Sequence, residues 1–219
     1  MIFASISYLN LLPFQIFFKK SVRSTQIKQI AFYKKNVPSF INKKFLKRKV
    51  DAAFISSIKA KKANCTNIGI IAKKNVHSVL VLKNRDKRDD TESNTSNVLA
   101  KILKLDGEVL IGDKALRYYL SHNQEEFFDL AELWYEKTKL PFVFAKLCSN
   151  KNSKTINKVA KAFAKERVKV PYFYLKKEAK KRNISPKELR WYLNHIYYTI
   201  DYKEKKALKL FFKYAKNLS

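Results

Sequence analysis

The sequence predicts an α/β protein with two lobes and a helical C-terminal tail. Three observations carry this prediction. Short apolar runs alternate with helical patterns, one long stretch is wholly polar, and helix signatures dominate the last third of the chain. The 219 residues, 46% of them hydrophobic, are enough to bury a substantial core, so we expect a folded globule.

The first third alternates between strands and helices. We expect strands at Ile2–Ser7, Gln26–Tyr33, Val50–Ile55, Ile68–Ala72 and His77–Leu82, and a helix opened by Pro38. Ser56 and Ser57 follow one of these strands, at the place where a helix N-cap is expected. Because strands that alternate with helices usually run in the same direction, we expect a mostly parallel sheet.

The middle of the chain contains the polar stretch Lys83–Asn97, "KNRDKRDDTESNTSN". Such composition is typical of a linker, and we expect it to be a crossing between the lobes. After it we expect a helix at Val98–Leu105, a strand at Glu108–Gly112, helices starting at Asp113 and Asp129, and a buried strand at Leu140–Ala145. Two crossings between two lobes imply a cleft, where ligands usually bind.

We expect the last third to be helical. Ser185 to Glu188 has the form of a capping box with proline at the first helical position, and Asp201 to Glu204 repeats the box. The predicted division is therefore lobe 1 at residues 1–82 with 146–219, which includes the helical tail, and lobe 2 at residues 83–145.

The net charge of +29 raises two alternatives, a polyanion partner or a solvated lysine surface. The positive charge is mostly Lys, while Arg provides most bidentate contacts to phosphates and bases. The lysines are also spread along the whole chain. We therefore favour the solvated surface, whose positive field would still help to capture a small dianion.

The two cysteines, Cys65 and Cys148, stand alone, without a C-x-x-C motif, and we expect two free thiols in a reducing cytosol. The apolar run Phe14–Phe18 is too short to cross a bilayer and is followed by two lysines. With no secretion signal recognised, we expect a cytoplasmic protein.

The common catalytic templates are absent, since the chain has no G-x-G-x-x-G, no G-x-x-x-x-G-K-[ST] and no G-x-S-x-G motif. The three histidines lack metal-ligand spacing. Neutral polar residues instead lie at strand ends, strand starts and helix starts: Asn10, Ser56, Ser57, Ser78 and the run Ser93–Ser96. Each has an ordinary structural explanation, as a turn residue, an N-cap or, for Ser78, a hydroxyl satisfied by the backbone. Together they would face one cleft, and hydroxyls at a helix start favour a carboxylate.

Several segments resemble one family in the same order. "SISYLNLLPF", "DAAFISSI", "VHSVLVL", "SNTSNVLAKIL", "VLIGDKAL" and "DLAELWYEKTKLPFVFA" are similar to segments of the menaquinone-biosynthesis chorismate dehydratases of the futalosine pathway. These enzymes have the two-lobed type II fold of periplasmic solute-binding proteins. The resemblance implies that chorismate loses water to give 3-enolpyruvylbenzoate.

The resemblance also implies the site residues. Asn10 and Ser78 are the expected catalytic residues, and the expected substrate-binding residues are Ser56, Ser57, Ser93, Thr95, Ser96 and Asp113. The family motif S-R-T-S is Ser93–Ser96 here, with Asn94 in place of the arginine. Another cation would have to replace that arginine, and Lys114 and Arg117 are the candidates.

The expected partner is the small molecule chorismate, with no nucleic acid and no membrane, and the expected assembly is a monomer or a homodimer. We expect no cofactor and no metal. The first alternative is a non-catalytic anion-binding protein of the same fold, and a variant of it is the related dihydroxynaphthoate synthase of the same pathway. The second is a nucleic-acid binder, for which a steep salt dependence would be expected.

Overall fold

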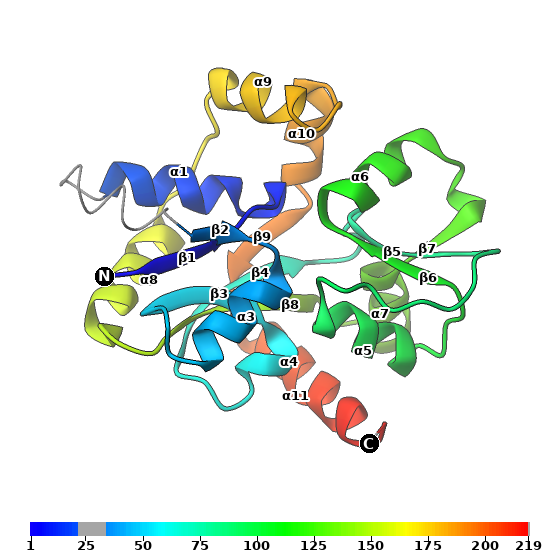
Figure 1. Cartoon of the computed structure of the whole chain (residues 1–219), viewed down its shortest axis with the longest axis horizontal. Coiled ribbons are helices and arrows are strands. Elements are labelled where there is room, and N and C mark those ends of the chain that lie inside the picture. The colour runs from blue at the N-terminus through cyan, green and yellow to red at the C-terminus, as the bar shows by residue number, and fades with distance from the viewer. Residues whose placement is uncertain (22–33, 219) are drawn as a thin grey trace.

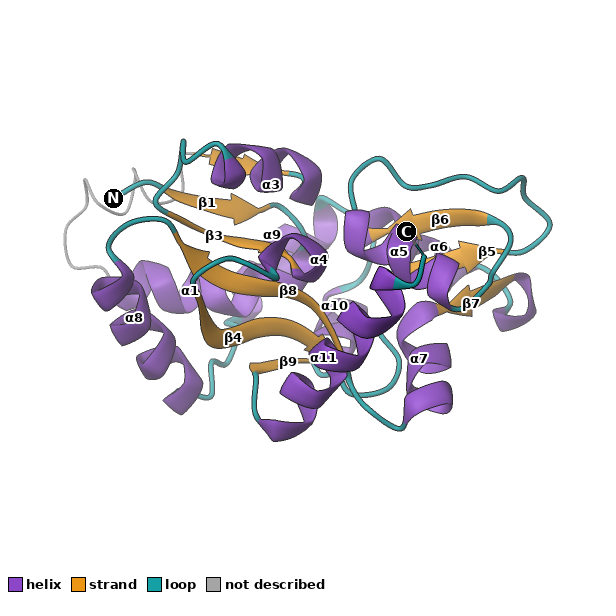
Figure 2. Cartoon of the chain, turned by 90° about the horizontal axis from the view of Figure 1, so that it is seen from below, coloured by secondary structure: helices purple, strands orange, loops and turns teal. Residues whose placement is uncertain are grey.

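The structure, a computed structural model, describes residues 1–21 and 34–218 and contains two β-sheets flanked by helices (Figure 1). The predicted strand at Gln26–Tyr33 lies outside the described residues. The large sheet has the strand order β2-β1-β3-β8-β4-β9, and the small sheet has the order β6-β5-β7. Figure 2 shows the two sheets at opposite ends of the molecule.

The strands of the large sheet are β1 (Phe3–Ile6), β2 (Lys34–Asn36), β3 (Ala52–Ser56), β4 (Cys65–Ala72), β8 (Phe142–Ser149) and β9 (Ile196–Thr199). Those of the small sheet are β5 (Val79–Leu82), β6 (Glu108–Ile111) and β7 (Phe127–Asp129). The helices are η1 (Leu9–Leu11), α1 (Leu12–Ser21), α3 (Pro38–Leu46), α4 (Ser57–Ala60), α5 (Asn94–Ile102), α6 (Gly112–Ser121), η2 (Gln124–Glu126), α7 (Leu130–Thr138), α8 (Ser153–Lys165), α9 (Tyr172–Lys180), α10 (Pro186–Leu193) and α11 (Tyr202–Lys216).

The large sheet is mixed, so the prediction of a mostly parallel sheet is wrong. β1 pairs in parallel with β2 and β3, whereas β8 is antiparallel to both β3 and β4, and β9 is antiparallel to β4. The small sheet is antiparallel throughout. The reason is the return of the chain: β8 comes back from the small sheet and inserts between β3 and β4 in the opposite direction.

The polar stretch Lys83–Asn97 does not cross between the two sheets, which corrects the prediction for it. The stretch leaves β5 and runs along the small sheet, where Arg88 forms a parallel bridge with Glu108. The connection from the large sheet to the small one is instead the short segment between β4 and β5, and the return connection precedes β8. A polar composition marks an exposed segment, but it does not show which elements that segment joins.

The last third of the chain contains a strand that the sequence analysis missed. β9 follows α10 and adds an edge strand to the large sheet beside β4. The predicted capping box at Ser185 is confirmed, because the Ser185 Oγ accepts from the Glu188 N–H and the Glu188 carboxylate accepts from the Ser185 N–H. At the second box, the Glu204 carboxylate accepts from the Asp201 N–H at 2.9 Å.

Aromatic rings fill the core beneath the large sheet. Phe14 on α1 stacks on Phe3 of β1 and meets Phe54 of β3 edge to face at 4.9 Å between ring centroids. It also meets Phe163 of α8 at 5.0 Å. The residues Leu12–Phe18 of α1 are all buried, so this part of the helix is enclosed on every side and anchors the start of the chain against the sheet.

The two cysteines form a disulfide, so the prediction of two free thiols is wrong. Cys65 on β4 lies directly opposite Cys148 on β8 in the antiparallel register, and their sulfur atoms are bonded. Their sequence separation of 83 made this pairing impossible to recognise along the chain, because only the insertion of β8 beside β4 brings them together.

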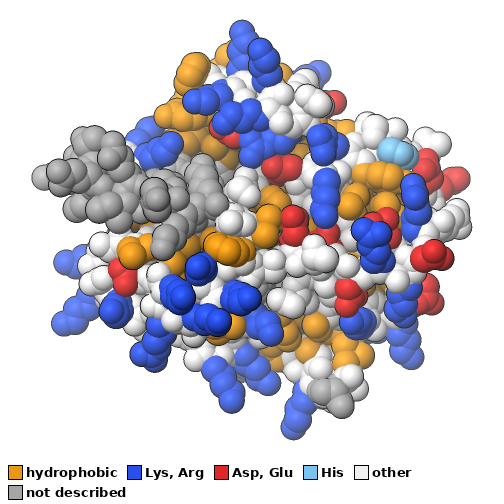
Figure 3. Space-filling view, in the orientation of Figure 1, with side chains coloured by type: hydrophobic (Ala, Val, Ile, Leu, Met, Phe, Trp, Pro, Cys, Tyr) orange, Lys and Arg blue, Asp and Glu red, His pale blue; other side chains and the backbone are white. Residues whose placement is uncertain are grey.

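The surface carries its positive charge broadly. Lys and Arg side chains are scattered over the face in Figure 3, with acidic side chains between them, rather than gathered into one stripe. None of the helices in residues 1–21 and 34–218 combines the length and apolar content that a bilayer crossing needs.

Candidate active site

A small cavity lies between the two sheets. Residues of β1, β3, β4 and β8 line it from the large sheet, and β5, β6 and the start of α5 line it from the small-sheet side. Its polar lining consists of Tyr8, Asn10, Ser56, Ser78, Ser93 and Ser96. No Asp, Glu, Lys, Arg or His of the described residues lines this cavity. Five of these six polar residues, all but Tyr8, were predicted from the sequence.

Asn10 presents an unoccupied acceptor to the cavity. It lies on η1, directly after β1 has ended, so its position is set by the buried strand behind it. Its backbone carbonyl accepts a 2.7 Å hydrogen bond from the Tyr198 hydroxyl. Its side-chain Oδ1 is buried without a partner among the described residues. Because an unpaired buried amide oxygen is costly, this atom is suited to accept a hydrogen bond from a ligand.

Ser78 lies on the connection from β4 to β5 and is buried. Its Oγ is 2.9 Å from the Tyr192 hydroxyl of α10, and its carbonyl accepts from the Gly112 N–H at 2.8 Å. Gly112 has a positive φ of 68°, and a Cβ there would stand 2.6 Å from the Tyr8 ring. Only glycine therefore lets α6 begin this close to the cavity.

The N-terminus of α5 opens toward the cavity. Ser93 is the N-cap: its Oγ accepts from the Ser96 N–H at 3.2 Å and lies 2.9 Å from the Ser96 hydroxyl. Free N–H groups and the positive end of the helix dipole favour an anion at such a place. Asn94, which replaces the arginine of the resembling motif, is exposed and does not line the cavity.

Three of the predicted site residues lie outside the cavity lining. Ser57 donates to the Val143 carbonyl at 2.6 Å, and the Thr95 Oγ1 accepts from the Ile58 N–H at 3.2 Å. The Asp113 carboxylate accepts from the Leu9 N–H at 3.0 Å. Each of these bonds connects parts of the chain that surround the cavity, and none of the three residues lines it.

The two candidate replacement cations are also outside the cavity. The Lys114 ammonium pairs with Asp90 at 2.8 Å, and Arg117 is exposed. Arg182, which follows α9 and was not predicted from the sequence, contacts one of the predicted site residues instead. Its Nε donates to Asp113 at 2.8 Å, its Nη2 donates to the Ser7 carbonyl at 3.0 Å, and it also binds Glu178.

Two tyrosines were also missed. The Tyr8 hydroxyl donates to the Glu92 carboxylate, and burial together with this carboxylate raises the pKa of Tyr8 far above its ordinary value. Its place in "SISYLN", two positions before Asn10, was the available indication. Tyr192 is 114 positions from Ser78, and no local pattern of the sequence indicated their contact.

A buried histidine and a buried carboxylate lie behind the site. The Asp129 carboxylate accepts from the backbone N–H groups of Val76 and His77 and from the first turn of α7. Burial raises the pKa of Asp129 to about 6, and burial lowers the pKa of His77 to about 4. His77 is therefore neutral at pH 7, and neither side chain lines the cavity.

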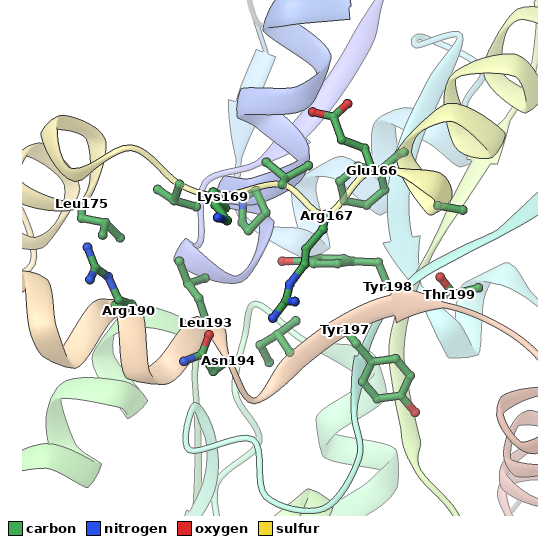
Figure 4. A pocket seen from close by; sticks show the side chains of 16 residues that line it. Glu166, Arg167, Lys169, Leu175, Arg190, Leu193, Asn194, Tyr197, Tyr198 and Thr199 are labelled. Carbon is green, nitrogen blue, oxygen red and sulfur yellow. The ribbon is translucent and has the colours of Figure 1, made fainter.

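A larger groove of about 820 Å³ lies on the other side of Tyr198, beneath the segment that joins α8 to α9 (Figure 4). Arg167, Lys169 and Arg190 are at its rim, and Figure 4 shows Tyr197 and Tyr198 pointing to opposite sides of β9. None of the predicted site residues lines this groove. Exposed cations are common on this lysine-rich chain, so they do not mark the groove as the site.

The architecture is that of the two-lobed periplasmic-binding-protein-like fold. The chain is similar to a crystal structure of an Archaeoglobus fulgidus protein, with a TM-score of 0.65, 12% identity, and coverage of 99% of this chain and 97% of the other. It is also similar to the alkanesulfonate-binding protein of Xanthomonas axonopodis, with a TM-score of 0.51, 12% identity, and coverage of 100% and 92%. These similarities show the fold alone.

The particular family follows from sequence comparison. A family model described as "Menaquinone biosynthesis" matches residues 104–217. The chorismate dehydratase of Campylobacter jejuni is 46% identical over 222 residues, which span 100% of this chain and 99% of that relative. The chain therefore belongs to the menaquinone biosynthesis family, as the resemblance of its motifs indicated.

Proposed function

We propose that the protein is a chorismate dehydratase, which converts chorismate to 3-enolpyruvylbenzoate and water in the futalosine pathway to menaquinone. The observation that carries the proposal is the 46% identity over the full length of the Campylobacter jejuni chorismate dehydratase. The cavity supports it, because it gathers Asn10, Ser78 and the Ser93 end of α5 from distant parts of the chain.

The proposed reaction suits a neutral site. A ring C–H bond of chorismate breaks, its electron pair becomes part of the aromatic ring, and the neighbouring hydroxyl leaves with a proton as water. Aromatisation supplies the driving force, so the protein mainly has to align the C–H bond and the leaving group. It also has to stabilise the charge that builds on the ring carboxylate. The balanced equation needs no cofactor.

The lining residues have distinct proposed roles. Asn10 and Ser78 orient the enolpyruvyl arm and the leaving hydroxyl, with the free Asn10 Oδ1 as an acceptor. Ser93, Ser96 and the first N–H groups of α5 hold a carboxylate, and Ser56 adds a hydroxyl to the wall. Ser57, Thr95 and Asp113 would act on the substrate only through the neighbours that they bind.

The substrate itself is the proposed proton acceptor. None of the described residues that line the cavity is an acid or a histidine, so no protein base faces the reacting carbon. The carbon that loses its proton carries the enolpyruvyl arm of chorismate. This arm is attached through an ether oxygen and bears the carboxylate. A carboxylate held this close has the reach of an intramolecular base.

The cavity has to enlarge to take up chorismate. Its volume is about 50 Å³, whereas ligand pockets usually measure about 300–1,000 Å³. We propose that the predicted lobes, residues 1–82 with 146–219 and residues 83–145, separate to admit the substrate and close on it. Strand β5 (Val79–Leu82) falls within the residues predicted for the first lobe but pairs in the small sheet, so it would move with the second lobe.

Turnover of chorismate by the purified protein tests the proposal. We expect an aromatic product in the ultraviolet spectrum, with a mass lower by one water. Replacing Ser78 by alanine, or Asn10 by alanine, should lower kcat by about 10²–10³-fold, because each removes a group aimed at the reacting atoms. The matched control is Ser149→Ala, a buried serine on β8 outside the cavity lining, which should leave kcat unchanged.

Other outcomes would reject the proposal. Chorismate that is bound but never converted would identify a non-catalytic binding protein of the same fold. Full turnover by both Ser78→Ala and Asn10→Ala would show that the reaction does not use this cavity.

A further inference from the structure

The Tyr192 hydroxyl touches the site from outside the cavity. It lies 2.9 Å from the Ser78 Oγ, and the Tyr192 side chain is 2% exposed. We infer that Tyr192 is a positioning residue, which holds the Ser78 hydroxyl so that the Ser78 proton points at the substrate. This inference rests on the proposed dehydratase function and adds to it a residue that does not line the cavity.

The position of α10 in the fold places this hydroxyl next to the site. The capping box at Ser185 starts α10, and the buried face of the helix consists of Leu189 and Tyr192, one turn apart. A buried tyrosine hydroxyl needs a hydrogen-bond partner. The partner here is the hydroxyl of a predicted catalytic serine, and the side chain of Asn10, the other predicted catalytic residue, is a second hydrogen-bond neighbour of Tyr192.

The direction of the hydrogen bond follows from what the cavity has to bind. Burial raises the pKa of Tyr192 well above its ordinary value, so the phenol is protonated at neutral pH and has one proton to donate. When it donates to the Ser78 Oγ, the Ser78 proton is left to point into the cavity. The opposite direction would aim serine lone pairs at an anionic substrate, which is unfavourable.

Neighbouring contacts hold α10 in this position. Arg182, just before the helix, donates to the Ser7 carbonyl at the end of β1. On the other side, the Trp191 ring lies 4.6 Å from the ring of His77, the residue before Ser78. Tyr192 is therefore fixed relative to both β1 and the connection that carries Ser78.

Two variants are compared in the full chain with chorismate. Tyr192→Phe keeps the buried ring and removes the hydroxyl, and we expect kcat to fall by about 10–100-fold while KM changes by less than about threefold, as for other residues that orient a site group. The control is Tyr197→Phe, which removes a hydroxyl bonded to Glu204 at 2.8 Å, outside the cavity lining, and should leave kcat unchanged. Thermal unfolding of each variant gives its stability.

A double variant separates positioning from general destabilisation. If Tyr192 acts through Ser78, adding Tyr192→Phe to Ser78→Ala should cause no further loss of kcat. Independent, multiplicative losses would overturn the inference, and so would an unchanged kcat in Tyr192→Phe or an equal loss in Tyr197→Phe.

Fluorotyrosine at position 192 covers the case in which the phenylalanine variant does not fold. It keeps the ring and the hydroxyl but makes the hydroxyl a stronger donor, and we expect kcat to change by at least about twofold. The same replacement at position 197 should have no effect, and equal behaviour at both positions would overturn the inference. Failure of the wild-type protein to convert chorismate would instead reject the proposed function.

Discussion

Asn10 and Ser78 come to the cavity by different local means. Asn10 follows the buried end of β1 on the short helix η1, whereas Ser78 follows His77, whose φ of 58° turns the chain between β4 and β5. A positive φ is strained for a histidine, so the surroundings of His77 must enforce it. The rings of Tyr119, Trp191 and His195 surround it, and the Asp129 carboxylate holds its N–H.

The burial of His77 leads to a prediction for acid stability. Its folded-state pKa of about 4 lies below the unfolded value of about 6.5. Between these values only the unfolded state holds the proton, so stability is lost as the pH falls from about 6.5 to about 4. Relative to His77→Asn, the wild-type free energy of unfolding should fall by up to about 3 kcal/mol over this window.

Denaturant unfolding at several pH values measures this difference. Asp129 titrates in the same window with the opposite sign, because burial raises its pKa, and it is retained in both proteins. Tyr119 and His195, whose rings contact His77, are retained as well. Parallel pH profiles for wild type and His77→Asn would contradict the prediction.

Helices α9 and α10 close one side of the site. In Figure 1 the two helices lie at the top of the view, above the large sheet, and α10 runs down between α1 and α6. Arg182 follows α9 and connects Asp113 of α6 with the end of β1, while Tyr192 of α10 reaches Ser78. These helices therefore contact both sides of the cavity through polar groups, and the proposed separation of the lobes would have to break these contacts.

We expect Arg182→Gln to weaken this closure. The change removes a half-buried guanidinium that binds two carboxylates, and it should lower the free energy of unfolding by about 1–3 kcal/mol. KM for chorismate should rise more than kcat falls, because Asp113 of α6 then keeps its bond to the Leu9 N–H but loses its contact with Arg182. The exposed Arg117→Gln, one helical turn from Asp113, is the control. An unchanged KM in Arg182→Gln would show that closure does not depend on this contact.

Strands β4 and β8 lead to the connections that join the two sheets. β4 leads out of the large sheet toward β5, and β8 returns beside it, so both connections leave from the middle of one sheet. The Cys65–Cys148 disulfide links these two strands within the large sheet. The disulfide therefore stabilises the large sheet and does not link it to the small one.

Loss of the disulfide should cost stability without loss of activity. Its loop of 83 positions is long, and removing such a bond costs about 2–5 kcal/mol. We expect Cys65→Ser with Cys148→Ser to unfold more easily by this amount and to keep kcat within about twofold, since neither cysteine lines the cavity. Two reactive thiols in the unreduced wild-type protein would contradict the assignment of the bond.

The sequence alone predicted most individual elements. Pro38 and Ser185 marked true helix starts, and the apolar runs marked β1, β3, β4, β5, β6 and β8. Resemblance of motifs pointed to Asn10, Ser78 and Ser93, and the structure brings these three together. Such features depend on residues within a few positions of each other, which is why they can be recognised along the chain.

How these elements pair could be seen only in the folded structure. The direction of β8, the edge strand β9, the disulfide and the contact between Ser78 and Tyr192 all join residues far apart in the sequence. The structure also shows that the adjacent residues Ser56 and Ser57 have different surroundings, because Ser56 lines the cavity and Ser57 faces the core. Local periodicity carries no information on such contacts, because they form only when the free energy of packing brings distant segments together.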